Sequence, residues 1–187
     1  MSTALHRTTD ELEASLDHLR AAPADGGTLE LIVRRPAIDE REVLEEADIH
    51  PDLGLVGDNW PEKASSSTPD GGPHPDKQLT VMNARCAALV AGDTERMPLA
   101  GDQLYVDLDI GVENLPAGTR LAIGTAVIEI TEPPHTGCAK FSSRFGLDAL
   151  RFVNSPAGKA LRLRGANAKV IEGGTVRKGD TVKKVIP

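Results

Sequence analysis

The sequence is poor in aromatic residues and in cysteine, and it contains no long hydrophobic run. Aromatic residues make up 3% of the 187-residue chain, which disfavours the stacking platforms of single-strand nucleic-acid-binding proteins. Two cysteines, Cys86 and Cys138, are too few for a disulfide-rich scaffold or, alone, for a tetrahedral zinc site. No apolar segment approaches the roughly 18 residues of a membrane span, and the polar N-terminus does not look like a signal peptide. We therefore expect a cytoplasmic protein without membrane association.

Several other signatures are missing. The formal net charge is -7, whereas a nucleic-acid-binding surface is typically basic, so we expect no nucleic-acid partner. The five histidines are dispersed and show no metal-ligand spacing. The chain has no Gly-x-Gly-x-x-Gly fingerprint, no Walker loop and no Gly-x-Ser-x-Gly elbow. Nicotinamide dehydrogenases, P-loop NTPases and α/β-hydrolases are therefore not supported.

What is present is a series of short strands separated by glycine-rich turns. This pattern, with a few helices between the strands, predicts a mainly β fold of the α+β type, a β-barrel with peripheral helices. We expect a helical arm over residues 1–27 and a domain over residues 28–187. The expected strands cover residues 28–35, 78–82, 103–109, 120–131, 168–171 and 181–186, and Gly124 marks a turn or bulge within the fourth. The expected helices cover residues 8–22, 40–47 and 83–91, and a further helix begins at Ser155-Pro156. Thr8 or Thr9 is the expected cap of the first helix, and Asn83 is the expected cap of the third.

The clearest irregular segment covers residues 61–76. It contains four prolines, a run of three serines and the pair Gly71-Gly72, so regular structure is not expected there. The segment is long for a connection inside a compact domain. It is either a lid over a site or a plain surface excursion.

The residues most suited to chemistry lie between 131 and 144. A strand ends at two prolines, and Cys138 follows Gly137 where a helix is expected to begin. Helix N-terminal N–H groups and the neighbouring His135, Lys140 and Arg144 favour thiolate over thiol, which lowers a cysteine pKa from about 8.5. The alternative is that Cys138 is a small buried apolar residue. Cys86 lies in an apolar helical run, where helix packing is the expected role.

Two polar turns are weaker candidates for a binding site. The first runs from residue 54 to 60 and contains Asp58 and Asn59 between two glycines and Trp60. The second contains Glu113 and Asn114 before Pro116. Each turn can present polar groups to a ligand, but each is also an ordinary turn sequence.

Taken in order, these segments resemble the MOSC domain, named for the C-terminal domain of molybdenum cofactor sulfurases. The resemblance covers residues 29–186. The segments that carry it are Gly54-Leu-Val-Gly-Asp58, Gln78-Leu-Thr-Val-Met-Asn-Ala84, Glu113-Asn-Leu-Pro-Ala-Gly-Thr-Arg-Leu-Ala-Ile-Gly124, Ala126-Val-Ile-Glu-Ile-Thr131, His135-Thr-Gly-Cys-Ala-Lys-Phe141 and Gly165-Ala-Asn-Ala-Lys-Val-Ile-Glu-Gly-Gly-Thr-Val-Arg-Lys-Gly-Asp180.

The resemblance implies a MOSC-type β-barrel with a cysteine at its cofactor end. It implies that Cys138 is the catalytic residue, either as a thiolate ligand of the metal in the molybdenum cofactor or as a persulfide carrier. The residues expected to contribute to cofactor binding are Asp58, Asn59, Asn114 and His135, with Lys140 and Arg144 as candidates for the phosphate of the pterin. Pyridoxal phosphate is not expected, because in family sulfurases it sits on a separate domain.

Three functions follow from this resemblance. The first is a molybdenum-cofactor-dependent reductase of N-hydroxylated or related small molecules, which needs an electron-donor protein because the chain carries no flavin or iron–sulfur motif. The second is a persulfide sulfur carrier served by a cysteine desulfurase. The third is a non-catalytic binding module for a small anionic ligand.

Overall fold

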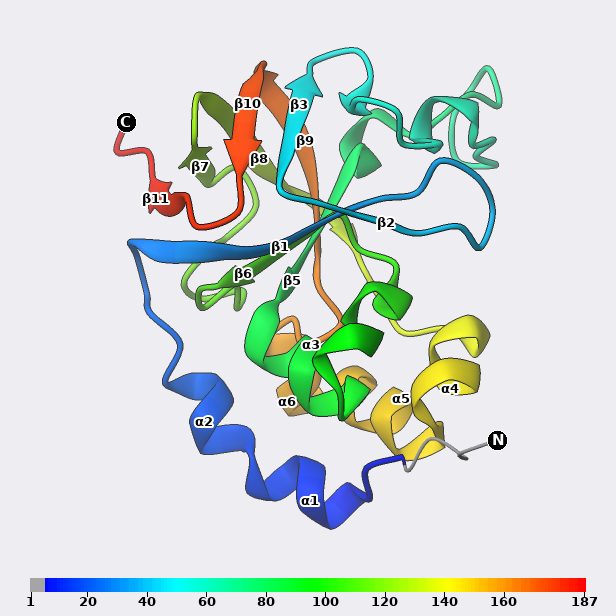
Figure 1. The fold of residues 1–187 in the computed structure, drawn as a ribbon, viewed down its shortest axis with the longest axis vertical. Coiled ribbons are helices and arrows are strands. Elements are labelled where there is room, and N and C mark those ends of the chain that lie inside the picture. The colour runs from blue at the N-terminus through cyan, green and yellow to red at the C-terminus, as the bar shows by residue number, and fades with distance from the viewer. Residues whose placement is uncertain (1–5) are drawn as a thin grey trace.

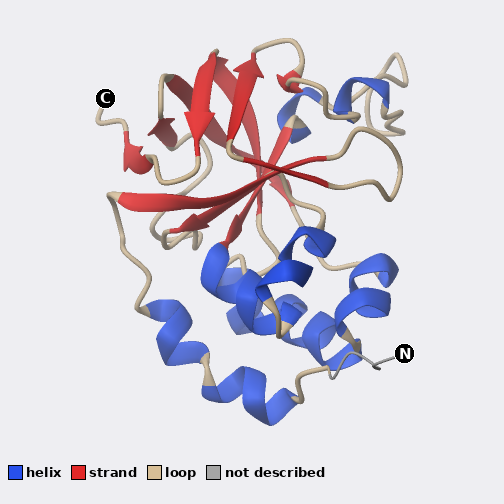
Figure 2. Cartoon of the chain, in the orientation of Figure 1, coloured by secondary structure: helices blue, strands red, loops and turns tan. Residues whose placement is uncertain are grey.

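A closed β-barrel forms the centre of the molecule. The computed structural model describes residues 6–187, and the helices gather at one end of the barrel (Figures 1 and 2). Seven strands follow one another in the order β11-β7-β8-β9-β5-β6-β1, and pairing of β11 with β1 closes the ring. The strands are β1 (Gly27–Arg34), β5 (Leu79–Asn83), β6 (Leu104–Asp107), β7 (Arg120–Ile123), β8 (Ala126–Pro134), β9 (Ala166–Glu172) and β11 (Thr181–Lys184).

The barrel strands pair antiparallel except β5 and β6, which are parallel. A parallel pair needs a crossover, and here the crossover is formed by α3 (Ala84–Ala91) and the 3-10 segment η3 (Thr94–Ala100). Gly124 has φ +56 and makes the turn between β7 and β8, as expected. Apolar side chains fill the barrel interior, among them Leu29, Val81, Leu104 and Ile128, all fully buried. These features confirm the predicted β-barrel.

A small second sheet corrects part of the sequence prediction. The expected helix at residues 40–47 is wrong: β2 (Glu42–Leu44) extends β1, and β3 (Glu46–His50) pairs with β10 (Gly174–Arg177) and β4 (Gly54–Leu55). Burial alternates along β3, with Ala47 and Ile49 facing inward. The strand β10 occupies a segment in which only turns were expected. Both errors arise because a sheet pairing between distant segments is invisible to local charge and turn patterns.

The N-terminal arm forms two short helices rather than one. Thr8 caps α1 (Thr9–Ala14), and a capping box with Glu11 is complete, as the sequence suggested. The chain breaks at Ser15 before α2 (Leu16–Arg20). Leu12 and Leu19 are buried in the same apolar cluster as α3 and α5. The arm therefore packs against the helical end of the molecule (Figure 1).

The remaining helices pack at the same end of the barrel. They are α4 (Ala139–Phe145), α5 (Leu147–Asn154) and α6 (Pro156–Ala160). Asn83 caps α3 and Ser155 caps α6, as predicted. Phe141 and Phe145 pack edge to face, with ring centroids 5.0 Å apart, inside the cluster between helices and barrel. No helix among residues 6–187 has the length and apolar character needed to cross a membrane.

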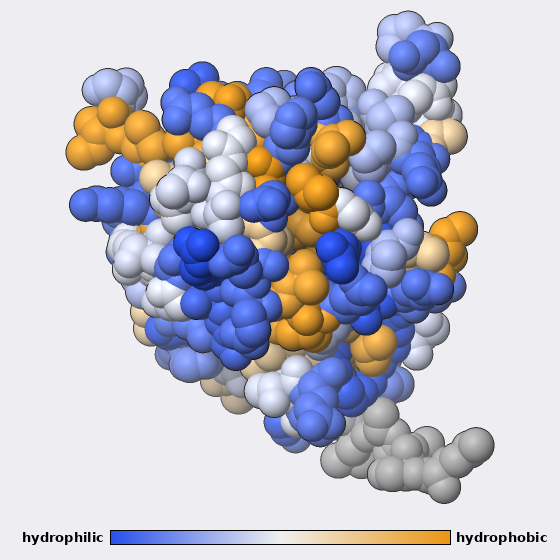
Figure 3. Space-filling model, turned by 45° about the horizontal axis from the view of Figure 1, so that its top comes forward, coloured by the Kyte–Doolittle hydropathy of each residue, from blue (hydrophilic) through white to orange (hydrophobic). Residues whose placement is uncertain are grey.

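The segment predicted to be irregular is largely turns, with short 3-10 segments at its two ends, η1 (Trp60–Glu62) and η2 (Pro75–Lys77). The Trp60 indole N–H donates to the His74 carbonyl at 3.3 Å and ties the base of the segment together. The segment projects from the barrel at the upper right of Figure 1. Figure 3 shows hydrophilic residues over most of one face, with hydrophobic residues in patches between them.

Candidate functional site

Cys138 lies at the junction between β8 and α4. The cysteine is the N-cap residue of α4 and is exposed, so the alternative of a buried apolar cysteine does not apply. The preceding Gly137 is held by the Asn154 side chain, which accepts from the Gly137 N–H at 2.9 Å and donates to its carbonyl at 3.2 Å. A Cβ at position 137 would come within 2.7 Å of Leu150 and 3.1 Å of Val153. A side chain at position 137 would therefore have to displace Leu150 of α5.

The two cysteines differ in acidity. Partial burial of Cys138 opposes its ionisation, but the N–H groups of Phe141 and Lys140 and the charges of Arg164 and Arg144 outweigh that effect and lower its pKa. Complete burial raises the pKa of Cys86 to about 12. Cys86 is thus a packing residue of α3, as expected, and Cys138 is the cysteine with thiolate character.

A buried array of three charged or titratable side chains lies next to the Cys138 turn. Asp102 is fully buried and binds Arg164, with Oδ2 2.6 Å from Nη1. Its other oxygen, Oδ1, is 3.2 Å from His135 Nε2. Burial alone would raise the pKa of Asp102, but Arg164 and His135 hold it at about 2. Burial lowers the pKa of His135, which favours its neutral form near pH 7.

Packing around this array is tight. The Arg164 guanidinium lies over the Phe141 ring, 5.0 Å from its centroid. Gly165 has φ +122, and a Cβ there would approach Asp102 Oδ1 and His135 Cδ2 to 3.1 Å each. The start of β9 therefore closes over Asp102 only because residue 165 has no side chain.

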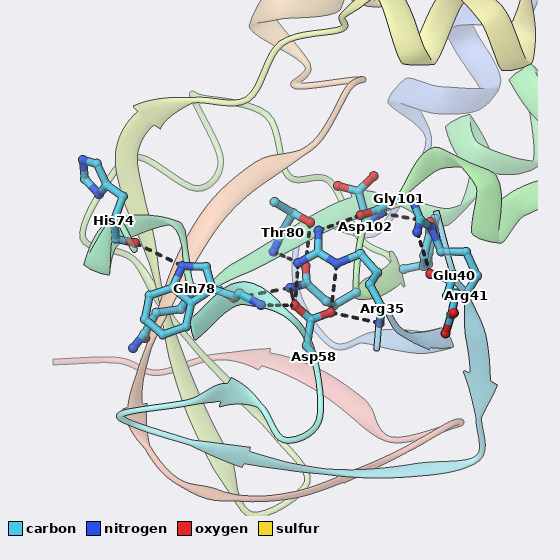
Figure 4. Close-up of polar contacts among 12 residues, drawn as sticks. Arg35, Glu40, Arg41, Asp58, His74, Gln78, Thr80, Gly101 and Asp102 are labelled. Carbon is cyan, nitrogen blue, oxygen red and sulfur yellow. Dashed lines mark hydrogen bonds and ion pairs between the residues drawn. The ribbon is translucent and has the colours of Figure 1, made fainter. Parts of the chain in front are cut away.

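Three consecutive carbonyl groups before β6 accept hydrogen bonds from three arginines. Arg144 donates to Leu99 O at 2.8 Å and Arg164 to Ala100 O at 2.9 Å. Arg35 donates to Gly101 O at 3.0 Å (Figure 4). The carbonyl groups of residues 99–101 thus bring together guanidinium groups from the residue after β1, from α4 and from the segment before β9.

Asp58 forms a bidentate ion pair with Arg35. Both carboxylate oxygens accept from the guanidinium, at 2.7 and 2.8 Å, and Oδ1 also accepts from the Trp60 N–H (Figure 4). Burial opposes ionisation of Asp58, but the hydrogen bonds and charge of Arg35 prevail and lower the Asp58 pKa. The neighbouring Asn59 donates its N–H to Arg35 O, and its side-chain Oδ1 is buried without a hydrogen-bond partner in residues 6–187. Asp58 therefore positions Arg35, and Asn59 keeps a free acceptor.

Arg35 and other basic side chains near Asp58 form what we call the cationic cluster. Lys140 Nζ and Arg144 Nη2 both contact Asp39 Oδ1, at 3.3 and 3.0 Å. Lys63 is exposed as a whole residue, but neighbouring protein atoms partly desolvate its charged group. This desolvation and the charges of Arg35 and Arg41 lower the pKa of Lys63 to about 8. A cavity of about 290 Å³ lies between Lys63 and His135. The members of the cationic cluster are Arg35, Arg41, Lys63, Lys140 and Arg144.

Asn114 lies apart from these groups. Its Nδ2 donates to Ala24 O at 2.9 Å and Asp109 O at 2.7 Å, and its Oδ1 accepts from Lys184 Nζ at 2.6 Å. None of these partners lines the cavity at His135. The structure thus places Asn114 in a connection between the barrel and the N-terminal arm.

Sequence reasoning missed several members of the site. The missed residues come from four segments, and none stands in a recognisable motif: they are Asp102, Arg164, Lys63, and the two arginines between β1 and β2, Arg35 and Arg41. The only local hint was the row of turn residues at Gly101-Asp102, which is too common to be diagnostic.

The fold and the site together define a β-barrel protein with one exposed, acidified cysteine beside a cluster of basic side chains. The chain belongs to the MOSC domain family: the family model for the MOSC domain matches residues 71–183. The resemblance seen in the sequence is therefore confirmed. No functionally curated protein matches the sequence.

Solved structures share the fold at low sequence identity. The YuaD protein from Bacillus subtilis aligns with a TM-score of 0.61 and 17% identity, over 83% of this chain and 93% of that one. YiiM from Escherichia coli aligns with a TM-score of 0.57 and 19% identity, over 86% and 70%. YiiM from Geobacillus stearothermophilus gives 0.51 and 13%, over 87% and 74%. At these identities the likeness concerns the fold alone.

Proposed function

We propose that this protein binds the molybdenum cofactor, with Cys138 as the protein ligand of the metal, and reduces N-hydroxylated or related small molecules. The observation that carries the proposal is the exposed Cys138 thiol, whose pKa is lowered, in a turn next to an array of basic groups. A thiolate is a soft ligand suited to such a metal. The MOSC family membership supports the same cofactor class.

The side chains of the site suit an anionic cofactor. In the cationic cluster the basic groups outnumber the carboxylates that face them, Asp39 and Asp58. Arg41 Nε is buried and has no hydrogen-bond partner among residues 6–187, and the same holds for Asn59 Oδ1. A phosphate would satisfy the free donor, and an N–H group of a pterin would satisfy the free acceptor.

Each part of the site has a role in this proposal. Bound cofactor supplies the metal centre that exchanges electrons with the substrate, and an electron-donor protein replenishes them. Lys140, Arg144 and Arg41 would hold the phosphate. Asp102 fixes Arg164, and its Oδ1 lies 3.2 Å from Nε2 of His135, which lines the cavity. The described residues contain no group of three or more His, Cys, Asp or Glu side chains that could hold a metal ion, so Cys138 is the proposed protein ligand.

Metal analysis of purified protein tests the proposal. Protein made in a host that produces the cofactor should contain molybdenum and pterin. Cys138→Ala should lose the molybdenum, and Cys86→Ala is the matched control that should keep it, because Cys86 is buried in α3. Absence of molybdenum from the unmodified protein, or equal content in Cys138→Ala, would contradict the proposal.

A sulfur-carrier role is the second candidate, and the exposure of Cys138 favours it, because a persulfide must reach a partner protein. After incubation with a cysteine desulfurase and cysteine, mass spectrometry should then show one added sulfur atom at Cys138. A thiol that never gains sulfur rules this role out. A non-catalytic binding module, the third function, would retain its anionic ligand in Cys138→Ser.

A further inference from the structure

A second cavity lies against His135, next to the one beside the cationic cluster. Its volume is about 310 Å³, and it lies where the end of β8, the start of β9 and the end of α6 meet. His135 and Asn167 line both cavities. Thr136, two residues before Cys138, lines the second one. The two cavities are therefore neighbours that share His135.

One wall of the second cavity carries basic groups without counter-ions. Arg162 is half-buried, and its Nη1 donates to Ile110 O and Leu115 O at 3.2 and 2.5 Å. No carboxylate in residues 6–187 forms an ion pair with Arg162 or with Lys159. Glu132 also lines the cavity but is exposed and unpaired within that range. A half-buried guanidinium without an acid partner favours an anion.

The backbone of this wall has a further feature. Arg164 also lines the cavity but is paired with Asp102, so the unpaired guanidinium is that of Arg162. Arg162 has φ +48 just beyond the end of α6, a backbone conformation that favours glycine. An arginine there bears a conformational cost of about 1–2 kcal/mol. Strained backbone of this kind clusters at active sites and ligand clamps.

Apolar residues also line the cavity, namely Val112, Pro133, Val153 and Ala166. Burial of their surfaces stabilises an apolar ligand body by roughly 25 cal/mol per Å². The cavity therefore combines basic and apolar lining residues, which suits a small amphiphilic anion better than inorganic phosphate.

We propose that the second cavity binds a small organic carboxylate, with its carboxylate group at Arg162 and Lys159 and its apolar body against Val112 and Pro133. Through the shared His135, such a ligand lies next to the cationic cluster and the Cys138 turn, in the position of a substrate. The role as substrate pocket rests on the proposed function, whereas the binding of the carboxylate does not.

Calorimetry with benzoate and its neutral analogue benzamide tests this inference on the full chain. Benzoate should bind at least about tenfold more tightly than benzamide, because benzamide lacks the charge. Arg162→Gly and Lys159→Glu should each weaken benzoate about tenfold or more and leave benzamide unchanged. Glycine suits φ +48 and Lys159 is exposed, so both variants should fold. Arg151→Ala, which removes an exposed charge from α5, is the matched control and should bind benzoate normally.

Equal affinity for benzoate and benzamide would overturn the inference. Unchanged benzoate affinity in both variants, or an equal loss in Arg151→Ala, would overturn it as well. Molybdenum content of the same preparations separates this result from the proposed function: Cys138→Ala should lose molybdenum and keep benzoate, and Lys159→Glu should do the reverse. A protein that binds benzoate through Arg162 but never holds molybdenum would remove the cofactor proposal and leave the carboxylate site standing.

Discussion

At the scale of single residues, the surroundings of Cys86 and Cys138 give these two thiols different exposure and different pKa values. Cys86 is fully buried on α3, and Cys138 is exposed at the first turn of α4. Backbone N–H groups lower the pKa of Cys138, and burial raises that of Cys86 to about 12. The environment also decides the state of a carboxylate, because Arg164 and His135 keep the buried Asp102 ionised.

Thiol reactivity should follow this difference. We expect iodoacetamide to alkylate Cys138 in the native protein with a pH midpoint below about 8.5, the value of a free cysteine. Cys86 should react only after unfolding. The measurement is alkylation rate against pH in Cys86→Ala, with Cys138→Ser as the control that should show no native reaction. A midpoint at or above 8.5 would contradict the lowered pKa.

Asp102→Asn should destabilise the protein at pH 7 by about 3–5 kcal/mol, because Arg164 is left buried without its partner. The folded pKa of Asp102, about 2, is below its unfolded value of about 3.9. Its ion-pair contribution is therefore complete above about pH 5 and is lost as pH falls toward 2. Urea unfolding at pH 7 and pH 3 should show the difference between variant and unmodified protein shrinking.

The control for this experiment is Glu46→Gln, which removes the partner of Arg177 in an exposed pair. Exposed pairs contribute at most about 1 kcal/mol, so its effect should be small. An Asp102→Asn effect no larger than that of Glu46→Gln would show that the buried pair contributes no special stability.

At the scale of elements, the site depends on how α5 holds the connection between β8 and α4. Asn154 at the end of α5 bonds both the N–H and the carbonyl of Gly137. This clamp fixes the backbone one residue before Cys138, so it also fixes the thiol against the N–H groups of α4.

Asn154→Ala should therefore act on both stability and chemistry. We expect a loss of about 1–2 kcal/mol, since two hydrogen bonds disappear, and a shift of the Cys138 titration toward that of a free thiol. Urea unfolding and alkylation against pH measure the two effects. Arg151→Ala, an exposed change on the same helix, should alter neither. Lower stability with an unchanged titration would mean that α4 alone positions the thiol.

At the scale of the whole molecule, charge is segregated. The chain has a formal net charge of -7, yet the site carries the cationic cluster. Repulsion between Lys63, Arg35 and Arg41 is part of the cause that lowers the Lys63 pKa to about 8. An anion bound in the site would relieve that repulsion, so we expect it to stabilise the fold.

Phosphate should therefore raise the melting temperature more than chloride at equal ionic strength. At ten times its dissociation constant the rise should be roughly 3–5 °C. Lys63→Met should reduce this difference, whereas Lys183→Met, an exposed change on β11, should leave it intact. Equal melting temperatures in phosphate and chloride would show that the cationic cluster does not select anions of this kind.

Elements with strong local signals were predictable from the sequence. The capping box at Thr8, the Asn83 cap of α3 and the Ser155-Pro156 start of α6 depend on residues within a few positions of one another. A run of Leu, Ile and Val before Pro36 likewise located β1, and alternation of apolar and polar residues located β6 and the β7–β8 hairpin. These elements form from local preferences, and the tertiary structure preserved them.

Pairings across the chain were not predictable. Residues 40–47 are rich in glutamate, which is typical of a helix, but β3 forms there because β10 supplies its hydrogen-bond partners. The Thr175 hydroxyl donates to Asp48 across 127 positions of sequence. Local composition does not predict a hydrogen-bond partner so distant in the sequence.

The sequence by itself determined the family, the barrel class and which of the two cysteines stands at the start of a helix, because these depend on motifs of adjacent residues. The tertiary structure alone decided what surrounds that cysteine. Closure of the barrel brings Arg35, Asp102, His135 and Arg164 from four segments to one place. Neighbours that only the fold supplies keep Asp102 ionised and favour the neutral form of His135.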